Sequence, residues 1–137
     1  VASWRARRED KRLKKYKVGR MDKDLNERLF NFAVAVLKFL PNLPKTVEFN
    51  VIKYQLAKSS TSSGANYEEA QAGSSKPDFN NKVRISLREM RESNYWLRVI
   101  SAILTDIKST EQINFLITES DELKKILGSI VTRTNKK

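Results

Sequence analysis

The chain has 137 residues, 39% of them hydrophobic, which is enough to fold one domain without disulfides or a structural metal. It contains no cysteine and no histidine, which excludes thiol nucleophiles, imidazole bases and zinc sites built on these residues. Lysine and arginine outnumber the acidic residues by 27 to 16, and the net charge of +11 becomes a strong positive field if the chain assembles.

Residues 1–20 form a basic leader, with nine basic and two acidic side chains. Neither Gly nor Pro interrupts residues 1–18, so the leader is either a basic helix or a flexible cationic arm. Trp4 and Tyr16 lie among its charges, a mixture that can hold a nucleic-acid backbone and stack on bases. The candidate nucleic-acid-binding residues of the leader are Arg5, Arg7, Arg8, Lys11, Arg12, Lys14, Lys15 and Lys17. The folded domain is expected to comprise residues 21–137.

Helical spacing predicts a first helix that begins with Asp24 as its N-cap and ends at Pro41 and Pro44. Phe30, Val34 and Leu37 lie on the side away from its core stripe, which is more apolar surface than a single core explains. The core stripe itself comprises Leu25, Leu29, Phe32, Val36 and Leu40.

A second segment opens near Thr46 and reaches a Ser-rich stretch at residues 59–66. Composition alone predicts a loop there. The competing interpretation keeps the stretch helical, with small side chains that let a neighbouring helix approach closely, and residues 67–72 favour helix. Gly73 then ends the segment. Its apolar positions before the Ser-rich stretch are Val47, Val51, Ile52 and Leu56.

The third helix is predicted to begin at Ser75, ahead of Pro77 and Asp78, and to run to about Leu104. A capping box at Ser109 and Gln112 opens a fourth helix. Since no strand pattern competes with these helical periods, the predicted fold is all-α, an up-and-down antiparallel four-helix bundle. The third helix has its core stripe at Phe79, Val83, Leu87, Met90, Leu97 and Leu104, and the fourth at Ile113, Leu116, Ile117, Leu123, Leu127 and Ile130.

The third helix, like the first, is apolar on two sides. One small domain builds one core, so the second side is expected to be buried against another subunit. For Trp96, packing in the domain's own core is the alternative. The predicted oligomer-interface residues are Phe30, Val34, Ile85, Trp96, Val99 and Ile103.

Arg84, Arg88, Arg91 and Arg98 are spaced by four, three and seven residues, which aligns them along one ridge of the third helix, with Tyr95 among them. Such a ridge can contact phosphates, and in an oligomer these contacts repeat, which gives an affinity that falls with salt. The alternative is that the arginines pair with glutamates within the helix or across subunits.

Polar residues that could meet between the second and third helices are Asn66, Tyr67, Glu68, Glu69, Glu89, Glu92, Asn94 and Tyr95. From these a structural polar cluster is predicted that comprises Asn66, Tyr67, Glu68, Glu92 and Tyr95. A catalytic interpretation would use its carboxylates as acid and base or as magnesium ligands. Bundle sites of that kind usually add Glu-x-x-His, and the chain has no histidine. The structural interpretation, in which hydrogen bonds fix helix register, is therefore preferred, and we expect no enzyme activity, no metal and no cofactor.

Five separated blocks at residues 24–33, 43–46, 63–70, 76–79 and 92–97 resemble the bacterial four-helix-bundle proteins encoded in 23S ribosomal RNA intervening sequences. This resemblance implies that the Ser-rich stretch belongs to a long second helix. It also implies a ring-shaped homo-oligomer, with a pentamer expected. The family is distantly similar to the accessory variability proteins of retroelements, which are basic, pentameric and bind nucleic acid.

The sequence thus predicts a cytoplasmic, non-enzymatic homo-oligomer that binds RNA or other nucleic acid through its basic surfaces and acts as a scaffold. The alternative is a protein–protein interaction scaffold without a nucleic-acid role. The apolar run Phe32 to Leu37 is too short to cross a bilayer, and the leader has too few apolar residues to insert into one, so no membrane partner is expected.

Overall fold

A computed structural model describes residues 24–73, 75–105 and 109–135. These residues form four long helices and one short 3-10 helix, and they contain no strand. The all-helical prediction is therefore confirmed. Residues 24–39 form the first helix, and the other elements are η1 (Leu40–Asn42), α2 (Val47–Ala72), α3 (Lys76–Ile103) and α4 (Thr110–Asn135).

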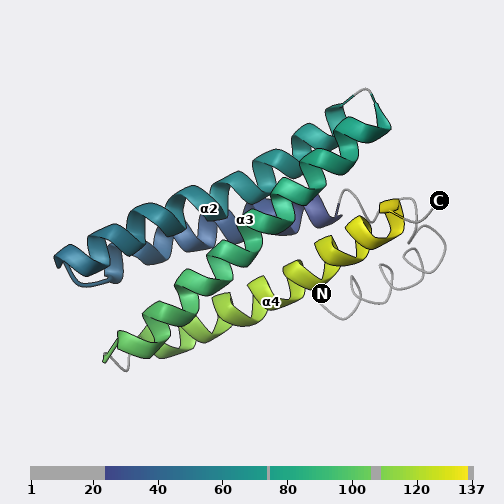
Figure 1. Ribbon diagram of the computed structural model, residues 1–137. Helices are drawn as coiled ribbons and strands as arrows, with labels where there is room; N and C mark the ends of the chain where they lie inside the picture. Colours follow the sequence, from purple (N-terminus) through teal and green to yellow (C-terminus); the bar gives the residue numbers. More distant parts are fainter. Residues whose placement is uncertain (1–23, 74, 106–108, 136–137) are drawn as a thin grey trace, which may run out of the picture.

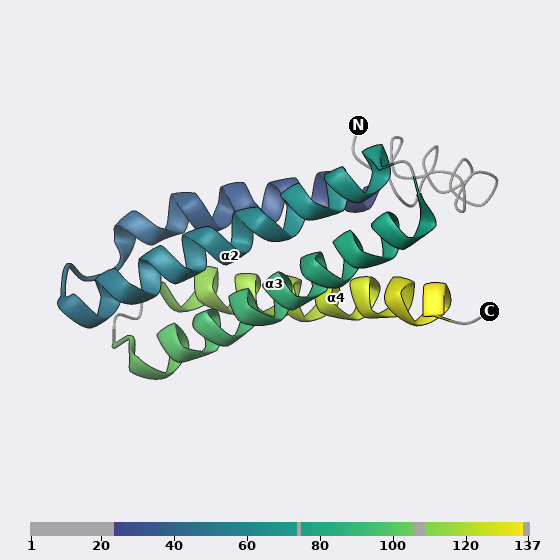
Figure 2. The same cartoon turned by 45° about the horizontal axis from the view of Figure 1, so that its top comes forward.

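The helices lie in two layers, the first helix with α2 and α3 with α4 (Figures 1 and 2). Side-chain hydrogen bonds show that neighbouring helices are antiparallel. Asn26, near the start of the first helix, donates to Gln71, near the end of α2. Asn94 in α3 donates to Ser120 in α4 at 2.8 Å, and α3 also packs along α2. The arrangement is an up-and-down bundle.

The helix ends follow local sequence signals. The Thr46 hydroxyl accepts a hydrogen bond from the Phe49 amide at 3.3 Å at the start of α2, and Ser75 accepts one from the Asp78 amide at 3.1 Å at the start of α3. Hydrogen bonding to Thr46 also lowers the pKa of the exposed Glu48 carboxyl in the first turn of α2. A carboxylate is favourable there because the N-terminus of a helix carries partial positive charge.

The Ser-rich stretch is part of α2, so the loop that composition alone predicted is wrong. Ser59 and Ser63 are buried and face α3. The Ser59 and Ser93 hydroxyls lie 2.7 Å apart, while Ser63 donates to the Ser86 carbonyl at 2.8 Å and Ser86 donates to the Ser63 carbonyl at 2.7 Å. These small side chains satisfy one another across the contact, so a polar segment is buried without orphaned groups.

Gly64 lies on the side of α2 that faces the first helix. A Cβ atom at this position would lie 3.3 Å from the Cβ of Leu29, which is tighter than an ordinary contact. The missing side chain therefore allows the two helices to approach closely, as the helical interpretation of this stretch predicted.

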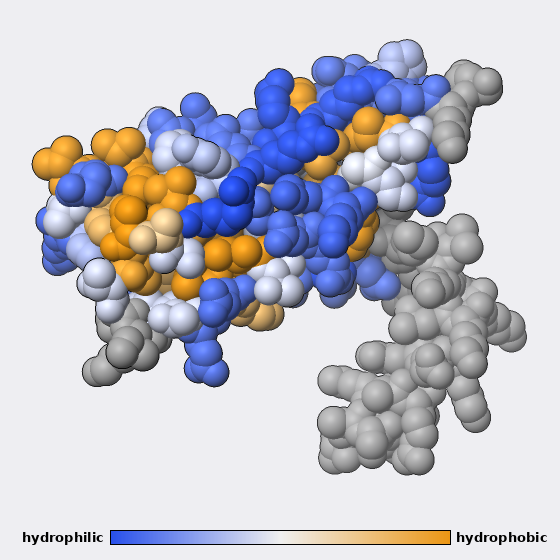
Figure 3. Space-filling view, turned by 60° about the horizontal axis from the view of Figure 1, so that its bottom comes forward, coloured by the Kyte–Doolittle hydropathy of each residue, from blue (hydrophilic) through white to orange (hydrophobic). Residues whose placement is uncertain are grey.

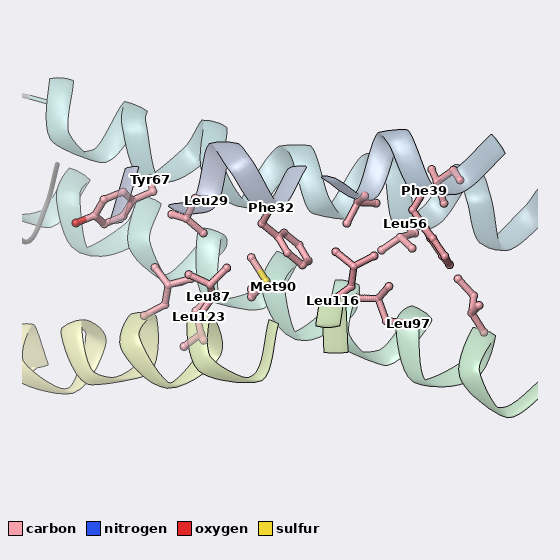
Figure 4. Packing of buried hydrophobic residues seen from close by; sticks show 14 of the residues in the cluster. Leu29, Phe32, Phe39, Leu56, Tyr67, Leu87, Met90, Leu97, Leu116 and Leu123 are labelled. Carbon is pink, nitrogen blue, oxygen red and sulfur yellow. The ribbon is translucent and has the colours of Figure 1, made fainter. Parts of the chain in front are cut away.

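One continuous core fills the space between the two layers, and side chains from all four helices point into it (Figure 4). Most of the predicted core positions are buried, although Phe79, Leu104 and Ile117 are only partly so. Val47 and Val51 are 80% and 54% exposed, so these two apolar positions of α2 lie outside the core. Residues from each helix in this core include Leu29, Phe32, Leu56, Tyr67, Leu87, Met90, Leu97, Leu116 and Leu123.

A partly exposed ion pair joins the first helix to α4. Arg28 binds Glu119 through two nitrogens, at 3.1 and 2.7 Å, and its terminal nitrogen also lies 2.9 Å from Glu122. The hydrogen bond to Glu119 is the main cause that raises the pKa of Arg28.

Among the described residues, no helix has an apolar stretch long enough to cross a membrane.

Candidate functional site

The arginine row consists of Arg84, Arg88, Arg91 and Arg98, which all lie on α3 and are all exposed. Their spacing places them away from the buried stripe of α3, on the side nearest α4. Arg84 reaches the side chain of Asn135 at the end of α4, and Arg98 at the other end of the row shares the Asn94 carbonyl oxygen with Lys124 of α4. The row therefore borders the seam between α3 and α4.

Carboxylates neutralise little of this row. Within the described part of the chain, its one ion pair joins Arg88 to Glu89 at 3.8 Å, and the Arg88 side chain is 70% exposed. Glu92 accepts a hydrogen bond from the Trp96 indole nitrogen at 3.2 Å, and Glu119 is bound to Arg28. Because Arg88 is the one arginine of the row with a carboxylate within ion-pair distance among the described residues, the row presents largely unpaired positive charge on the subunit surface.

A buried asparagine positions the basic side chains at one end of the row. Asn94 is 1% exposed, and its amide nitrogen donates to Ser120 at 2.8 Å and to Asp121 at 3.1 Å. Its carbonyl oxygen accepts from Arg98 at 3.0 Å and from Lys124 at 3.3 Å. Asn94 thus links α3 to α4 and holds two cations from different helices on one oxygen.

Lys124 belongs to no predicted site, whereas Asn94 was a candidate for the polar cluster between the second and third helices and instead bonds to α4. The available signal was position, since residue 94 lies four residues after Met90 and three before Leu97, on the buried side of the helix. A polar residue at such a position needs hydrogen-bond partners, which α4 supplies here.

Tyr95 lies within the arginine row, and it is 50% exposed. Its ring meets the Trp96 ring edge to face, with 5.1 Å between centroids and 73° between planes. The Arg98 guanidinium carbon lies 5.8 Å from the centroid of the Tyr95 ring, within the range of a cation–π contact. An aromatic side chain and a fixed cation therefore stand together at the surface.

The five residues of the predicted polar cluster lie in different surroundings. Asn66 donates to Ser62 within α2 at 2.9 and 3.0 Å, and Tyr67 is completely buried. Glu68 is exposed and borders the first helix, on a different side of α2 from the contact with α3. Glu92 and Tyr95 both contact Trp96 on α3. In the described residues, no group of three or more acidic side chains could hold a metal ion.

The predicted interface residues lie on two helices, and two of them, Trp96 and Val99, are partly buried against the domain's own core. Phe30, Val34 and Leu37 line a groove of about 340 Å³ between the first helix and α2, and Phe30 is 60% exposed. We call these three residues the first-helix face. The predicted interface residues of α3 form a second surface, which we call the α3 face and which comprises Ile85, Trp96, Val99 and Ile103. Ile103 is exposed, and the other three residues are half-buried.

Apolar side chains also gather at the end of the bundle where α2 and α4 begin, whereas much of the remaining surface in the same view is hydrophilic (Figure 3). Val47, Ile103 and Phe115 all lie near this end of their helices and are exposed. The residues proposed from the leader, Arg5 to Lys17, lie outside the described residues.

The fold and these surfaces define a class of protein: a helical bundle with an open cationic row and two apolar faces outside its core. The chain belongs to the 23S rRNA-intervening sequence protein family, whose sequence profile matches residues 21–129. A solved structure similar to it is a protein of unknown function from the S23 ribosomal protein family of Bacteroides thetaiotaomicron VPI-5482. The two share 34% sequence identity and superpose with a TM-score of 0.68, over 78% of this chain and 97% of that one. No curated protein matches the chain.

Proposed function

We propose that this protein is a non-enzymatic, cytoplasmic homo-oligomer that binds RNA or other nucleic acid through its basic surfaces and acts as a scaffold. The observation that carries the proposal is the arginine row, four exposed cations on one helix with a single carboxylate contact at 3.8 Å. Phosphates are the natural counterions of such a row, because guanidinium groups bind their oxygens with good geometry.

Assembly would multiply this effect. The first-helix face and the α3 face lie on diagonally opposite helices, since the first helix and α3 each pack beside α2 and α4. Two different apolar faces that bind each other form a head-to-tail contact, and such contacts form a ring when the rotation between subunits closes. We propose a ring of this kind, with five subunits as the expected number, in which the arginine row of every subunit faces the same polyanion.

The test is a salt titration of RNA binding. If the four arginines of one subunit each neutralise one phosphate of a single strand, affinity falls about 50-fold between about 50 and 200 mM salt. Reversal of Arg84, Arg88 and Arg91 to Glu should abolish most of the binding. A matched control reverses Lys38, Lys45 and Lys125, which are exposed residues outside the row, and changes the net charge equally.

Light scattering on each variant separates the possible outcomes. Lost binding with an intact oligomer supports the proposal, particularly if the control variant still binds. If binding persists but the oligomer dissociates, the arginines are interface residues. If the protein shows metal-dependent turnover that Glu68→Gln or Glu92→Gln abolishes, it is an enzyme and the proposal is wrong.

A second candidate function is a scaffold for proteins, and the exposed apolar side chains at the end of the bundle where α2 and α4 begin, among them Val47 and Phe115, are the observation that favours it. Exposed apolar patches of this kind commonly mark protein contacts. An oligomer that binds no nucleic acid at low salt would favour this function over the first.

A further inference from the structure

We propose that the arginine row binds a single strand, and that Tyr95 stacks on one base of that strand. This inference rests on the proposed nucleic-acid function and deepens it by naming the form of nucleic acid and the residue that contacts a base. Tyr95 follows Arg91 by four residues and precedes Arg98 by three, so it lies on the same ridge as the arginines.

The Tyr95 ring is held at the surface. One neighbour, Trp96, contacts the ring edge to face and is itself anchored by its hydrogen bond to Glu92. Another, Arg98, lies near the ring and is held by the buried Asn94. Since α3 is a regular helix of 28 residues, the backbone positions of Tyr95 and the four arginines are fixed relative to one another. A stacking residue needs this fixed presentation, because less side-chain freedom is then lost on binding.

The exposure of Tyr95 at the surface is what distinguishes a single strand from a duplex as the ligand. In a duplex, each base is covered by its neighbours and only its edges reach the grooves, so a tyrosine ring finds no free base face. In a single strand the base faces are accessible, and basic grooves with aromatic residues are the usual way to bind it. The arginine row spans roughly 21 Å along α3, which is long enough for a strand to place several phosphates beside the row and a base on Tyr95.

The decisive experiment compares two probes of equal length and charge, an oligonucleotide of about 12 residues with thymine bases and the same backbone without bases. Binding of the full chain is measured by fluorescence anisotropy at low salt. Tyr95→Ala should weaken binding of the thymine probe by about 5- to 150-fold. It should leave binding of the abasic probe unchanged, because the arginines that contact the backbone are still present.

Two further variants provide controls. Tyr95→Phe keeps the aromatic face and should bind both probes as the unmodified protein does. Tyr54→Ala removes an exposed tyrosine on α2, 65% accessible and outside the arginine row, and should change neither affinity. An oligouridine probe distinguishes RNA from DNA as the preferred strand, since it carries the 2′-hydroxyl.

The outcomes separate this inference from the proposed function. If Tyr95→Ala leaves binding of the thymine probe unchanged while the three arginine reversals abolish it, the stacking inference is overturned and the nucleic-acid function stands. If the arginine reversals change neither probe, the proposed function fails as well. Preferential binding of a duplex of the same length, or dissociation of the oligomer by Tyr95→Ala, would also overturn the inference, the latter by placing Tyr95 in a subunit contact.

Discussion

Arg28 illustrates how one residue joins two elements that are distant in sequence. Its side chain is 34% exposed and Glu119 is 21% exposed, so water screens the ion pair only in part. Two parallel hydrogen bonds to one carboxylate give the pair a defined geometry that a single charge would not provide. The pKa of Arg28 is raised, so its stabilising charge is present at every pH below the ordinary pKa of arginine and is lost only under strongly alkaline conditions.

Replacement of Arg28 should destabilise the bundle modestly. Arg28→Met keeps most of the apolar stem and removes the charge, and we expect the free energy of unfolding to fall by about 1 kcal/mol, because partial exposure limits the strength of the pair. Arg28→Lys should recover only part of this, since lysine cannot make the two parallel bonds. Urea denaturation followed by circular dichroism, at one fixed protein concentration, measures both values. Equal stability of Arg28→Lys and the unmodified protein would show that the two parallel hydrogen bonds of Arg28 contribute nothing to the free energy of unfolding.

For single residues, the sequence predicted which side chains are buried or exposed more successfully than it predicted which residues contact one another. Leu25, Leu29 and Val36 are buried and Phe30 is exposed, as helical spacing predicted. Spacing fixes the face of a helix on which a residue lies, but it does not identify the residue on the neighbouring helix that will meet it. For this reason the Asn94 contacts with α4 and the Arg28 contacts with Glu119 could only come from the structure.

At the level of the element, α2 shows where composition misleads. Ser and Gly are common in loops because they compete with or weaken helical hydrogen bonding, so residues 59–66 read as a loop when taken alone. In the bundle the same small side chains are favourable, because Ser59 and Ser63 bond to α3 and Gly64 admits the first helix. A tertiary contact therefore determines the secondary structure here. In the sequence, the helix-favouring residues 67–72 left both interpretations open, and the family resemblance decided between them.

Gly64 and Gly128 form a natural pair for testing this contact, since both lie inside helices. An added Cβ at Gly128 meets nothing within 4 Å, so Gly128→Ala should raise stability by about 0.5–1 kcal/mol through better helix propensity. At Gly64 the same gain is opposed by the contact with Leu29 at 3.3 Å. Gly64→Ala should therefore stabilise less than Gly128→Ala, and Gly64→Leu should destabilise by about 1–3 kcal/mol.

Thermal and urea unfolding of the three variants measure this difference. A combined Gly64→Ala and Leu29→Gly variant, compared with Leu29→Gly alone, provides the control, because glycine removes the Leu29 Cβ that crowds residue 64. The close-approach explanation is wrong if Gly64→Leu is as stable as Gly128→Ala.

At the level of the whole molecule, the sequence indicated that a single subunit leaves apolar surface uncovered. The first-helix face and the α3 face remain partly or largely exposed after the core has formed, although the bundle is complete. Periodicity could detect both faces because each has helical spacing, but it could not show which faces meet across subunits. The proposed head-to-tail ring makes that pairing specific, because each face should bind the other and not itself.

Mixing two variants, each with one of the two faces disrupted, tests whether the first-helix face binds the α3 face. Phe30→Asp places a charge in the first-helix face, at a residue that is 60% exposed. Ile103→Asp places a charge in the α3 face. Each variant therefore keeps one face that can still bind. In a head-to-tail ring, each variant alone should be monomeric, because its working face has no complementary face to bind. An equal mixture should form dimers of one Phe30→Asp and one Ile103→Asp subunit and nothing larger, since the two remaining faces are both blocked. Light scattering of the separate and mixed samples gives the subunit numbers. If either variant alone still forms dimers, its remaining face binds itself, and the assembly follows two-fold symmetry instead of a ring.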